Sequence, residues 1–230
     1  EGASSGAWRG YGTPGRFCPA DKRVRGGVLI VWDENLFAAG KLDNSVTVHI
    51  KGKMIEVTLQ DRAGDALTVV GAYMPTRDKH DDTVRPAWET LREIVTGRPG
   101  VVVMGDLNCT PDRLHAHDRF CASLPLHPVR PALSYPSWRP SRALDHILLS
   151  SSLEADEAEV LDRLFSDHLP VAVDIRLPQP CLAAIQADTD QCQYASGYRV
   201  LIKNTGLCAC PTAVSNECAI TVADTNFNIY

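Results

Sequence analysis

The fold is decided by the stretch Gly100-Val101-Val102-Val103-Met104-Gly105-Asp106-Leu107-Asn108-Cys109-Thr110-Pro111. Its run of β-branched apolar residues predicts a strand that is buried on both faces. The strand ends in Gly105, which permits a turn or a close approach of another group, and in two polar residues. Asp106 and Asn108 are two apart, so both side chains project to one side if the strand geometry continues. Taken alone, the pair is also typical of an ordinary turn.

Two later stretches place polar residues in the same way. Residues 142–150 read Arg-Ala-Leu-Asp-His-Ile-Leu-Leu-Ser, an apolar strand with the carboxylate of Asp145 at its start. Residues 165–173 read Phe-Ser-Asp-His-Leu-Pro-Val-Ala-Val, a turn that leads directly into a third strand. Asp106, Asn108, Asp145, Asp167 and His168 are therefore all predicted at strand ends, where rigid elements can converge on one site.

In this order, the three motifs resemble those of the endonuclease/exonuclease/phosphatase family, metal-dependent phosphodiesterases that include abasic-site nucleases and retroelement endonucleases. The resemblance covers residues 26–177 and does not extend to either end of the chain. It implies an α+β fold of the DNase I type, a two-layer β-sandwich flanked by helices. It also implies a hydrolase that uses Mg²⁺ or Mn²⁺.

The Ser-Asp-His turn carries two of the implied roles. By the resemblance, Asp167 is a metal ligand and His168 is the catalytic histidine at the scissile phosphate. A partner should fix the ring of that histidine, and Asp145 matches the family position for it. The alternatives are a capped turn for Asp167 and His168 and an ordinary strand-end residue for Asp145. Strand alternation places His146 on the opposite face, where a structural role is expected.

The remaining implied roles concern the water and the phosphate. By the resemblance, Asp106 activates or orients the attacking water, close to the metal, and Asn108 holds a non-bridging phosphate oxygen. Tyr73 lies where the family has a phosphate-contacting tyrosine, although a core aromatic at a strand end explains it nearly as well. His115 and His117 have the spacing of a metal-binding pair, but a solvated loop is the simpler interpretation.

The substrate is suggested by the loop before Asp145. Tyr135 and Trp138 lie among Arg139 and Arg142, and aromatic stacking with arginine contacts is one way in which proteins bind nucleic acid. We therefore expect nucleic acid, with DNA favoured, over a small phosphate ester or a phospholipid. The same loop could simply cover the edge of the sandwich. The net charge of −5 does not decide the question, because clustering of positive charge matters more.

Composition indicates a globular protein. The 230 residues, 44% hydrophobic and 22% charged, are enough for one good core and contain no apolar run that could cross a membrane. Five of the eight cysteines fall in the last fifty residues, and none forms a Cys-x-x-Cys pair. We expect free thiols and favour an intracellular location, while the sequence does not define the compartment.

Three segments are predicted along the chain. Residues 1–25 are expected to be irregular, residues 26–177 to form the phosphodiesterase domain, and residues 178–230 to form an unassigned tail that contains cysteines. Strands are predicted at 28–32, 45–50, 54–59 and 66–73, and an amphipathic helix at 87–95. The tail offers little periodic apolar surface, so we expect it to be dispensable for the core.

The sequence departs from the family pattern upstream of Gly26. The family begins with a strand that carries an asparagine, followed by a strand that ends in a metal-binding glutamate. Neither is evident in residues 1–25, so the expectation is an N-terminally incomplete or degenerate copy with impaired or no activity. Residues 219–223, Ala-Ile-Thr-Val-Ala, could instead fill the open sheet edge, since they superficially resemble the missing first strand.

Overall fold

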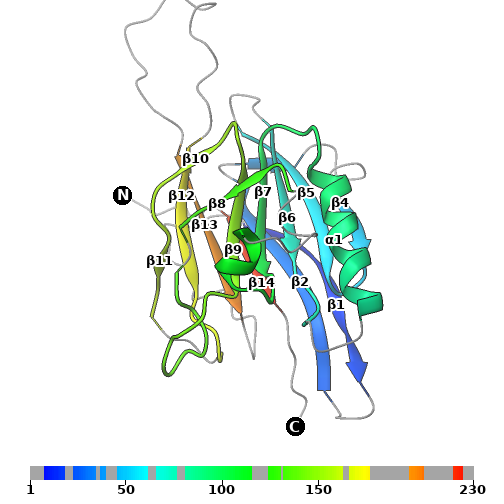
Figure 1. Ribbon diagram of the computed structural model, residues 1–230. Helices are drawn as coiled ribbons and strands as arrows, with labels where there is room; N and C mark the ends of the chain where they lie inside the picture. The colour runs from blue at the N-terminus through cyan, green and yellow to red at the C-terminus, as the bar shows by residue number, and fades with distance from the viewer. Residues whose placement is uncertain are drawn as a thin grey trace, which may run out of the picture.

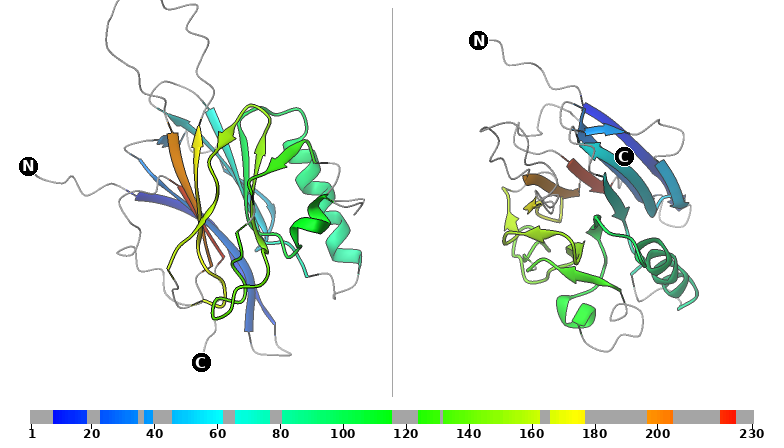
Figure 2. Two further views of the ribbon diagram at one scale, coloured as in Figure 1. Left: turned by 60° about the vertical axis from the view of Figure 1, so that its left-hand side comes forward. Right: turned by 90° about the horizontal axis from the view of Figure 1, so that it is seen from above.

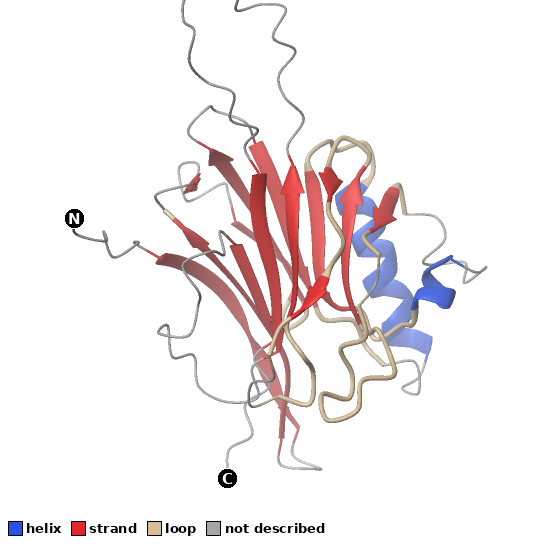
Figure 3. Cartoon of the chain, turned by 90° about the vertical axis from the view of Figure 1, so that its left-hand side faces the viewer, coloured by secondary structure: helices blue, strands red, loops and turns tan. Residues whose placement is uncertain are grey.

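The computed structural model describes residues 8–18, 23–34, 37–39, 46–61, 66–76, 81–115, 124–130, 132–162, 166–176, 197–204 and 220–224. Two seven-stranded sheets face each other, and a long helix covers the outer side of one of them (Figures 1 and 2). Figure 3 shows how strands dominate the molecule and how few helices flank them. The predicted two-layer β-sandwich of the DNase I type is confirmed.

The first sheet joins strands from both ends of the chain. Its order is β1 (Trp8–Cys18), β2 (Arg23–Asp33), β14 (Ile220–Asp224), β13 (Gly197–Asn204), β12 (Val171–Arg176) and β10 (Glu154–Ala155), and β11 (Glu159–Val160) also pairs with β12. Strands β13 and β14 are parallel, and the other pairs are antiparallel.

The second sheet is built from the middle of the chain. Its order is β3 (Phe37–Ala39), β5 (Met54–Asp61), β6 (Ala66–Ala72), β7 (Val101–Asp106), β9 (Asp145–Ser150) and β8 (Leu126–Pro128), and β4 (Val46–Ile50) also pairs with β5. Strands β6 and β7 are parallel because helix α1 (Asp81–Val95) connects them as a crossover. The short helix α2 (Pro111–His115) follows β7.

Two apolar clusters hold these layers together. One lies between the sheets and includes Ile30 and Trp32 from β2 together with Val102 and Met104 from β7. The other lies between the second sheet and α1, and includes Val101 and Val103 from β7. Alternate residues of β7 thus enter different clusters, and the whole strand is buried, as its sequence predicts.

Gly105 allows the end of β7 to lie against β6. Its φ angle is +143°, a conformation that residues with a side chain rarely adopt, and a Cβ atom there would lie 2.0 Å from the carbonyl oxygen of Ala72. No other residue fits without moving the backbone. This close approach fixes where the chain delivers Asp106.

Two expectations about the ends of the chain are wrong. Residues 8–18 form strand β1 of a long hairpin with β2, whereas residues 1–25 were expected to be irregular. As an edge strand with mostly exposed side chains, β1 needs no apolar alternation. Residues 197–204 and 220–224 of the expected tail form β13 and β14 in the middle of the first sheet. The alternative that residues 219–223 fill the open sheet edge thus agrees with β14, which pairs with β2, whereas no local pattern indicated β13.

Candidate active site

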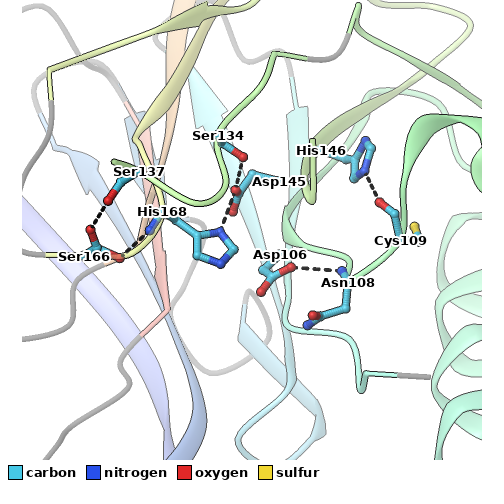
Figure 4. A network of polar contacts seen from close by, with 9 residues as sticks. All are labelled: Asp106, Asn108, Cys109, Ser134, Ser137, Asp145, His146, Ser166 and His168. Carbon is cyan, nitrogen blue, oxygen red and sulfur yellow. Dashed lines mark hydrogen bonds and ion pairs between the residues drawn. The ribbon is translucent and has the colours of Figure 1, made fainter. Parts of the chain in front are cut away.

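The predicted strand ends converge between the two sheets. Asp106 at the end of β7 is the register partner of Asp145 at the start of β9, and the turn that precedes β12 brings His168 to both. Figure 4 shows the ring of His168 pointing toward the side chains of Asp145 and Asp106. Four of the predicted site residues, Asp106, Asn108, Asp145 and His168, are therefore assembled in one place.

A buried hydrogen-bond network fixes the imidazole of His168. Its Nδ1 donates to Oδ2 of Asp145 over 2.8 Å, and the hydroxyl of Ser134 donates to the same oxygen. Asp145 is only 1% exposed and His168 8%. The backbone nitrogen of His168 also donates to Oγ of Ser166 over 3.1 Å. Among the described residues, Nε2 of His168 has no hydrogen-bond partner, so it is available to a ligand.

The surroundings of His168 favour its protonated form. Burial lowers the pKa of this imidazole, but the hydrogen bond and charge of Asp145 outweigh it, and the charges of Asp106 and Asp167 add to the effect. Together they raise the pKa of His168 to about 9. The side chain is therefore an imidazolium at neutral pH.

Asp106 is a buried carboxylate, and no cationic side chain among the described residues is bonded to it. It is 5% exposed, and its Oδ1 accepts one hydrogen bond, 2.9 Å long, from the backbone nitrogen of Asn108. Burial is the largest influence on its pKa, followed by the negative charge of Asp145. Despite the opposing effects of His168 and Asn108, the pKa of Asp106 is raised to about 7.

The geometry at Asn108 differs from the simple strand expectation. Strand β7 ends at Asp106, and Asn108 has a positive φ of 49°, so the alternation that would align its side chain with that of Asp106 does not continue. Asparagine tolerates this conformation better than most residues. Its Nδ2 donates to the carbonyl oxygen of Met74 over 2.8 Å, which holds the amide beside Asp106 (Figure 4).

Tyr73 and Asp167 each precede, in the sequence, a residue that is hydrogen-bonded within the site: Met74 and His168. Tyr73 is half-buried against the core between the sheets, and its neighbour Met74 donates its backbone nitrogen to the carbonyl oxygen of Asp106 over 2.9 Å. Asp167 is exposed, next to the buried His168. The roles that the resemblance implies for these two residues stay predictions.

Sequence reasoning missed Ser134 and Ser137, and it expected Tyr135 to contact nucleic acid without predicting its contact with His168. Ser134 shares Oδ2 of Asp145 with His168, and the ring of Tyr135 lies 4.7 Å from the imidazole, centroid to centroid. Ser137 bonds to the turn through its backbone nitrogen, 2.6 Å from the carbonyl oxygen of Asp167, and through its hydroxyl, 2.7 Å from that of Ser166. Only the serine of the Ser-Asp-His motif offered a sequence signal.

The other histidines do not enter the described site. His146 is buried, and its Nε2 lies 2.7 Å from the carbonyl oxygen of Cys109, on the side of β9 away from His168 (Figure 4). The structural role expected for it therefore fits its surroundings. His117 falls outside the described residues, and His115 ends α2.

The chemistry of the donor set fits a hard divalent cation. Asp106, Asp145 and Asp167 concentrate negative charge around one imidazole, and carboxylate oxygens are the ligands that Mg²⁺ prefers. Within the residues that the structure describes, no three His, Cys, Asp or Glu side chains are grouped closely enough to hold a metal ion by themselves.

Comparison with known proteins places the chain in a family. The sequence profile of the Endonuclease/Exonuclease/phosphatase family matches residues 3–168. The chain belongs to this family, whose members are hydrolases and are generally dependent on a divalent metal. The match begins at residue 3, whereas the resemblance of the sequence motifs begins only at residue 26. No curated protein matches the sequence significantly.

Solved structures support the fold. The endonuclease domain of TRAS1, a telomere-specific non-LTR retrotransposon, aligns with a TM-score of 0.53 and 18% identity over 75% of this chain and 80% of its own. The mannosyl-6-phosphatase Bt3783 of Bacteroides thetaiotaomicron has a TM-score of 0.53 and 17% identity, covering 73% and 76%. A family protein from Leptotrichia buccalis has a TM-score of 0.52 and 12% identity, covering 73% and 70%. An endonuclease and a phosphatase thus share this architecture.

Proposed function

We propose that the protein is a phosphodiester hydrolase that cleaves nucleic acid, with DNA as the favoured substrate and Mg²⁺ or Mn²⁺ as cofactor. The observation that carries the proposal is the buried Asp145–His168 pair beside the carboxylate of Asp106. Family membership supports hydrolase chemistry, and the choice of bond and substrate rests on the site itself.

The two buried groups are suited to opposite proton transfers. Asp106, with its pKa raised to about 7, can accept a proton from the attacking water near neutral pH. His168, with a pKa of about 9, is protonated there and can stabilise the charge on the phosphoryl oxygens or donate a proton from Nε2 to the leaving oxygen. Two titratable groups with distinct roles in one site are a recurrent pattern in enzymes.

Asp145 and Asn108 act by positioning and binding. Asp145 orients the imidazole and stabilises its positive charge, while Ser134 satisfies the same carboxylate oxygen. One amide hydrogen of Asn108 is used by Met74, and the rest of the amide can hold a non-bridging phosphate oxygen. A divalent cation held by Asp167, close to Asp106, would supply Lewis-acid stabilisation of the phosphate charge. Tyr73 is proposed as an additional phosphate contact.

The loop before β9 supports a nucleic-acid substrate. Trp138 is 64% exposed, and Arg139 and Arg142 beside it are exposed as well. Because Ser137 is bonded to the backbone of both Ser166 and Asp167, this loop is held against the catalytic turn. An exposed indole on a loop that also carries two exposed arginines can stack on a base while the arginines contact phosphates. Figure 1 shows this end of the molecule below β9 and β12.

The proposal is tested by comparing two substrates and two histidine variants. Nicking of supercoiled plasmid and release of phosphate from inositol phosphates would be measured across an Mg²⁺ titration. We expect nicking that His168→Ala reduces by a factor of about 10³, since general acid–base groups contribute factors of this size. The matched control is His127→Ala, an exposed histidine on β8, which should nick like the wild type.

Other outcomes would identify the alternatives. Phosphate release without nicking would favour a phosphatase on the same scaffold. No hydrolysis of either substrate at any Mg²⁺ concentration would mean that the domain is catalytically inactive. Equal nicking by His168→Ala and the wild type would contradict the assignment of the site.

A further inference from the structure

A buried histidine next to Asp145 takes no part in the proposed function. His146 lies on β9 and is 3% exposed. Leu148, two residues further along, belongs to the apolar cluster between the second sheet and α1, so alternation places His146 on that face, away from His168. Transfer of a polar ring into apolar surroundings costs free energy unless the ring is hydrogen-bonded. A residue that served only to fill this space could be apolar.

The hydrogen bond of His146 identifies what the ring holds. Its Nε2 lies 2.7 Å from the carbonyl oxygen of Cys109 (Figure 4). A carbonyl oxygen can only accept, so Nε2 carries the hydrogen and donates it. The register partner of His146 on β7 is Gly105, and β7 ends at Asp106. The ring therefore reaches past the end of this strand and holds the turn that follows it.

That turn has an uncommon backbone conformation at Asn108. Its φ angle of 49° lies in the left-handed region, which residues other than glycine adopt rarely, although asparagine does so more often than most. Before Asn108, the backbone nitrogen of Leu107 donates to the carbonyl oxygen of Leu144 over 2.9 Å. After Asn108, the ring of His146 holds the carbonyl oxygen of Cys109. The start of β9 and the residue before it thus fix the turn on both sides of Asn108.

The backbone of Asn108 decides where its amide lies. The amide nitrogen, Nδ2, donates to the carbonyl oxygen of Met74 over 2.8 Å, and the backbone nitrogen donates to Oδ1 of Asp106 over 2.9 Å. Both bonds depend on the shape of the turn, because the side chain and the backbone nitrogen are attached to the same Cα atom. A displacement of the carbonyl group of Cys109 would therefore move the amide of Asn108 within the site.

We propose that His146 is a positioning residue for Asn108, and that it acts by holding the carbonyl oxygen of Cys109. The inference rests on the proposed function, in which the amide of Asn108 holds a non-bridging phosphate oxygen. Two adjacent residues of β9 then align two parts of the site. Asp145 orients the imidazole of His168 on one face of the strand, and His146 fixes the turn with Asn108 from the other.

The first test compares two replacements of His146 in the full chain. His146→Phe keeps an aromatic ring but removes the donor, and we expect it to lower kcat/KM for plasmid nicking by about 100-fold, since small displacements of positioning groups have effects of this size. His146→Gln keeps an N–H donor on its side chain and should stay within about tenfold of the wild type. The matched control is His49→Phe, which removes a half-buried imidazole that lies 2.9 Å from Glu56, outside the site, and should nick like the wild type.

A double-mutant cycle separates positioning from packing. Asn108→Gly removes the amide and keeps a residue that adopts the left-handed conformation without strain. In this background, His146→Phe should lower kcat/KM by less than about tenfold, because the amide that His146 positions is gone. A loss of about 100-fold in both backgrounds, as expected if His146 only supports the fold, would overturn the inference.

A measurement on the wild-type chain does not depend on the folding of any variant. In long-range proton–nitrogen NMR spectra of the histidine rings, we expect His146 to carry a hydrogen on Nε2 and this hydrogen to exchange slowly with water. A ring of His146 that is protonated at Nδ1 alone would overturn the inference, because Nε2 could then not donate to the carbonyl oxygen of Cys109.

The NMR signal of the Asn108 amide separates this inference from the proposed function. This signal, identified by its absence in Asn108→Gly, should move in His146→Phe and stay in place in His49→Phe. Such a shift in a protein that cleaves no phosphodiester would support the positioning role and contradict the function. Nicking that His146→Phe leaves unchanged, with an unmoved amide signal, would overturn the inference and leave the function in place.

Discussion

Two buried carboxylates of the second sheet have contrasting surroundings. Glu56 on β5 accepts a hydrogen bond from Nη2 of Arg98 over 2.6 Å, and its other oxygen lies 2.9 Å from Nε2 of His49. Asp106, at the end of β7, accepts from the described residues a single hydrogen bond, from the backbone of Asn108, and is influenced by the negative charges of Asp145 and Asp167. One carboxylate is bonded to cationic side chains, whereas the other is buried near two further carboxylates, whose charges the imidazolium of His168 offsets only in part.

The pKa values follow these surroundings. Burial raises the pKa of Glu56, but the hydrogen bonds and charges of Arg98 and His49 outweigh it, so that the pKa is lowered. At Asp106, burial and like charge together raise the pKa to about 7. A buried charge that the chain leaves uncompensated destabilises the fold, and such groups are characteristic of functional sites. The comparison therefore assigns a structural role to Glu56 and a functional one to Asp106.

The largest effect is expected from deleting residues 181–230. The deletion removes β13 and β14, which lie in the middle of the first sheet, opposite the strand that carries Asp106. The deletion exposes the core face of β2 and β12, including Ile30, Trp32 and Val173. Each large apolar side chain contributes about 1.5–3 kcal/mol on burial, so these three alone contribute about 4.5–9 kcal/mol, comparable with the roughly 5–15 kcal/mol that holds a typical domain together. We expect the cooperative thermal transition in near-UV circular dichroism to disappear. A transition at the wild-type temperature would show that the tail is dispensable after all.

The next largest effect is expected from Asp145→Asn. This change alters the charge around Asp106 and His168 and leaves the surroundings of Glu56 as they are. The amide cannot stabilise the imidazolium of His168, so we expect the pKa of that ring to fall from about 9 and hydrolysis to slow by a factor of about 10³ or more. An NMR titration of the imidazole and a nicking assay would measure the two effects. Glu56→Gln is the matched control and should change hydrolysis by less than about twofold. Equal losses in both variants would mean that activity follows stability alone.

The strands and motifs near the site could be predicted from the sequence because their signals are local. The apolar run before Gly105 identifies β7, and the Ser-Asp-His turn identifies the catalytic histidine as a candidate. The pairing of Asp145 with His168 followed from the family resemblance and fits the 2.8 Å contact between them. Strands β4, β5 and β6 were likewise evident from alternation or apolar content.

What could not be predicted depends on contacts between distant parts of the chain. Strand β14 is short, and although its apolar residues suggested a strand, only its pairing with β2 reveals that Ile220 and Val222 continue the core face. Ser134 lies in a loop that matches no motif, so its hydrogen bond to Asp145 could not be predicted from the sequence. The turn at Asn108 departs from strand geometry because β7 ends two residues earlier. Tertiary packing decides each of these features.

A smaller effect is expected in the way stability depends on pH when no metal is present. Asp106 and Glu56 should contribute to this dependence with opposite signs. The folded-state pKa of Asp106 is raised from 3.8 to about 7 and that of His168 from 6.5 to about 9, so both groups favour the folded state at lower pH. The contribution of His168, about 3 kcal/mol, is fully present below pH 6.5 and is lost as the pH rises through 9. Glu56, with its lowered pKa, contributes stability above pH 4.5 that is lost on acidification.

Urea unfolding between pH 4 and pH 10 would measure this dependence. We expect Asp106→Asn to reduce the loss of stability between pH 4 and pH 7, and Glu56→Gln to reduce the loss on the acid side. Wild-type stability that rises steadily from pH 7 to pH 10 would contradict the assigned protonation of His168.

The smallest effect is expected from Trp138→Ala, which changes substrate binding and leaves both carboxylates in place. Because the indole is 64% exposed, its removal should leave the melting temperature unchanged. Stacking on one base contributes about 1–3 kcal/mol, so KM for DNA should rise about tenfold while kcat is retained. A small diester such as bis-p-nitrophenyl phosphate lacks neighbouring bases, and its hydrolysis should not change. Tyr11→Ala, an exposed aromatic on β1, serves as the control for general surface effects. An equal loss on both substrates would mean that Trp138 supports the catalytic turn through Ser137 and does not contact nucleic acid.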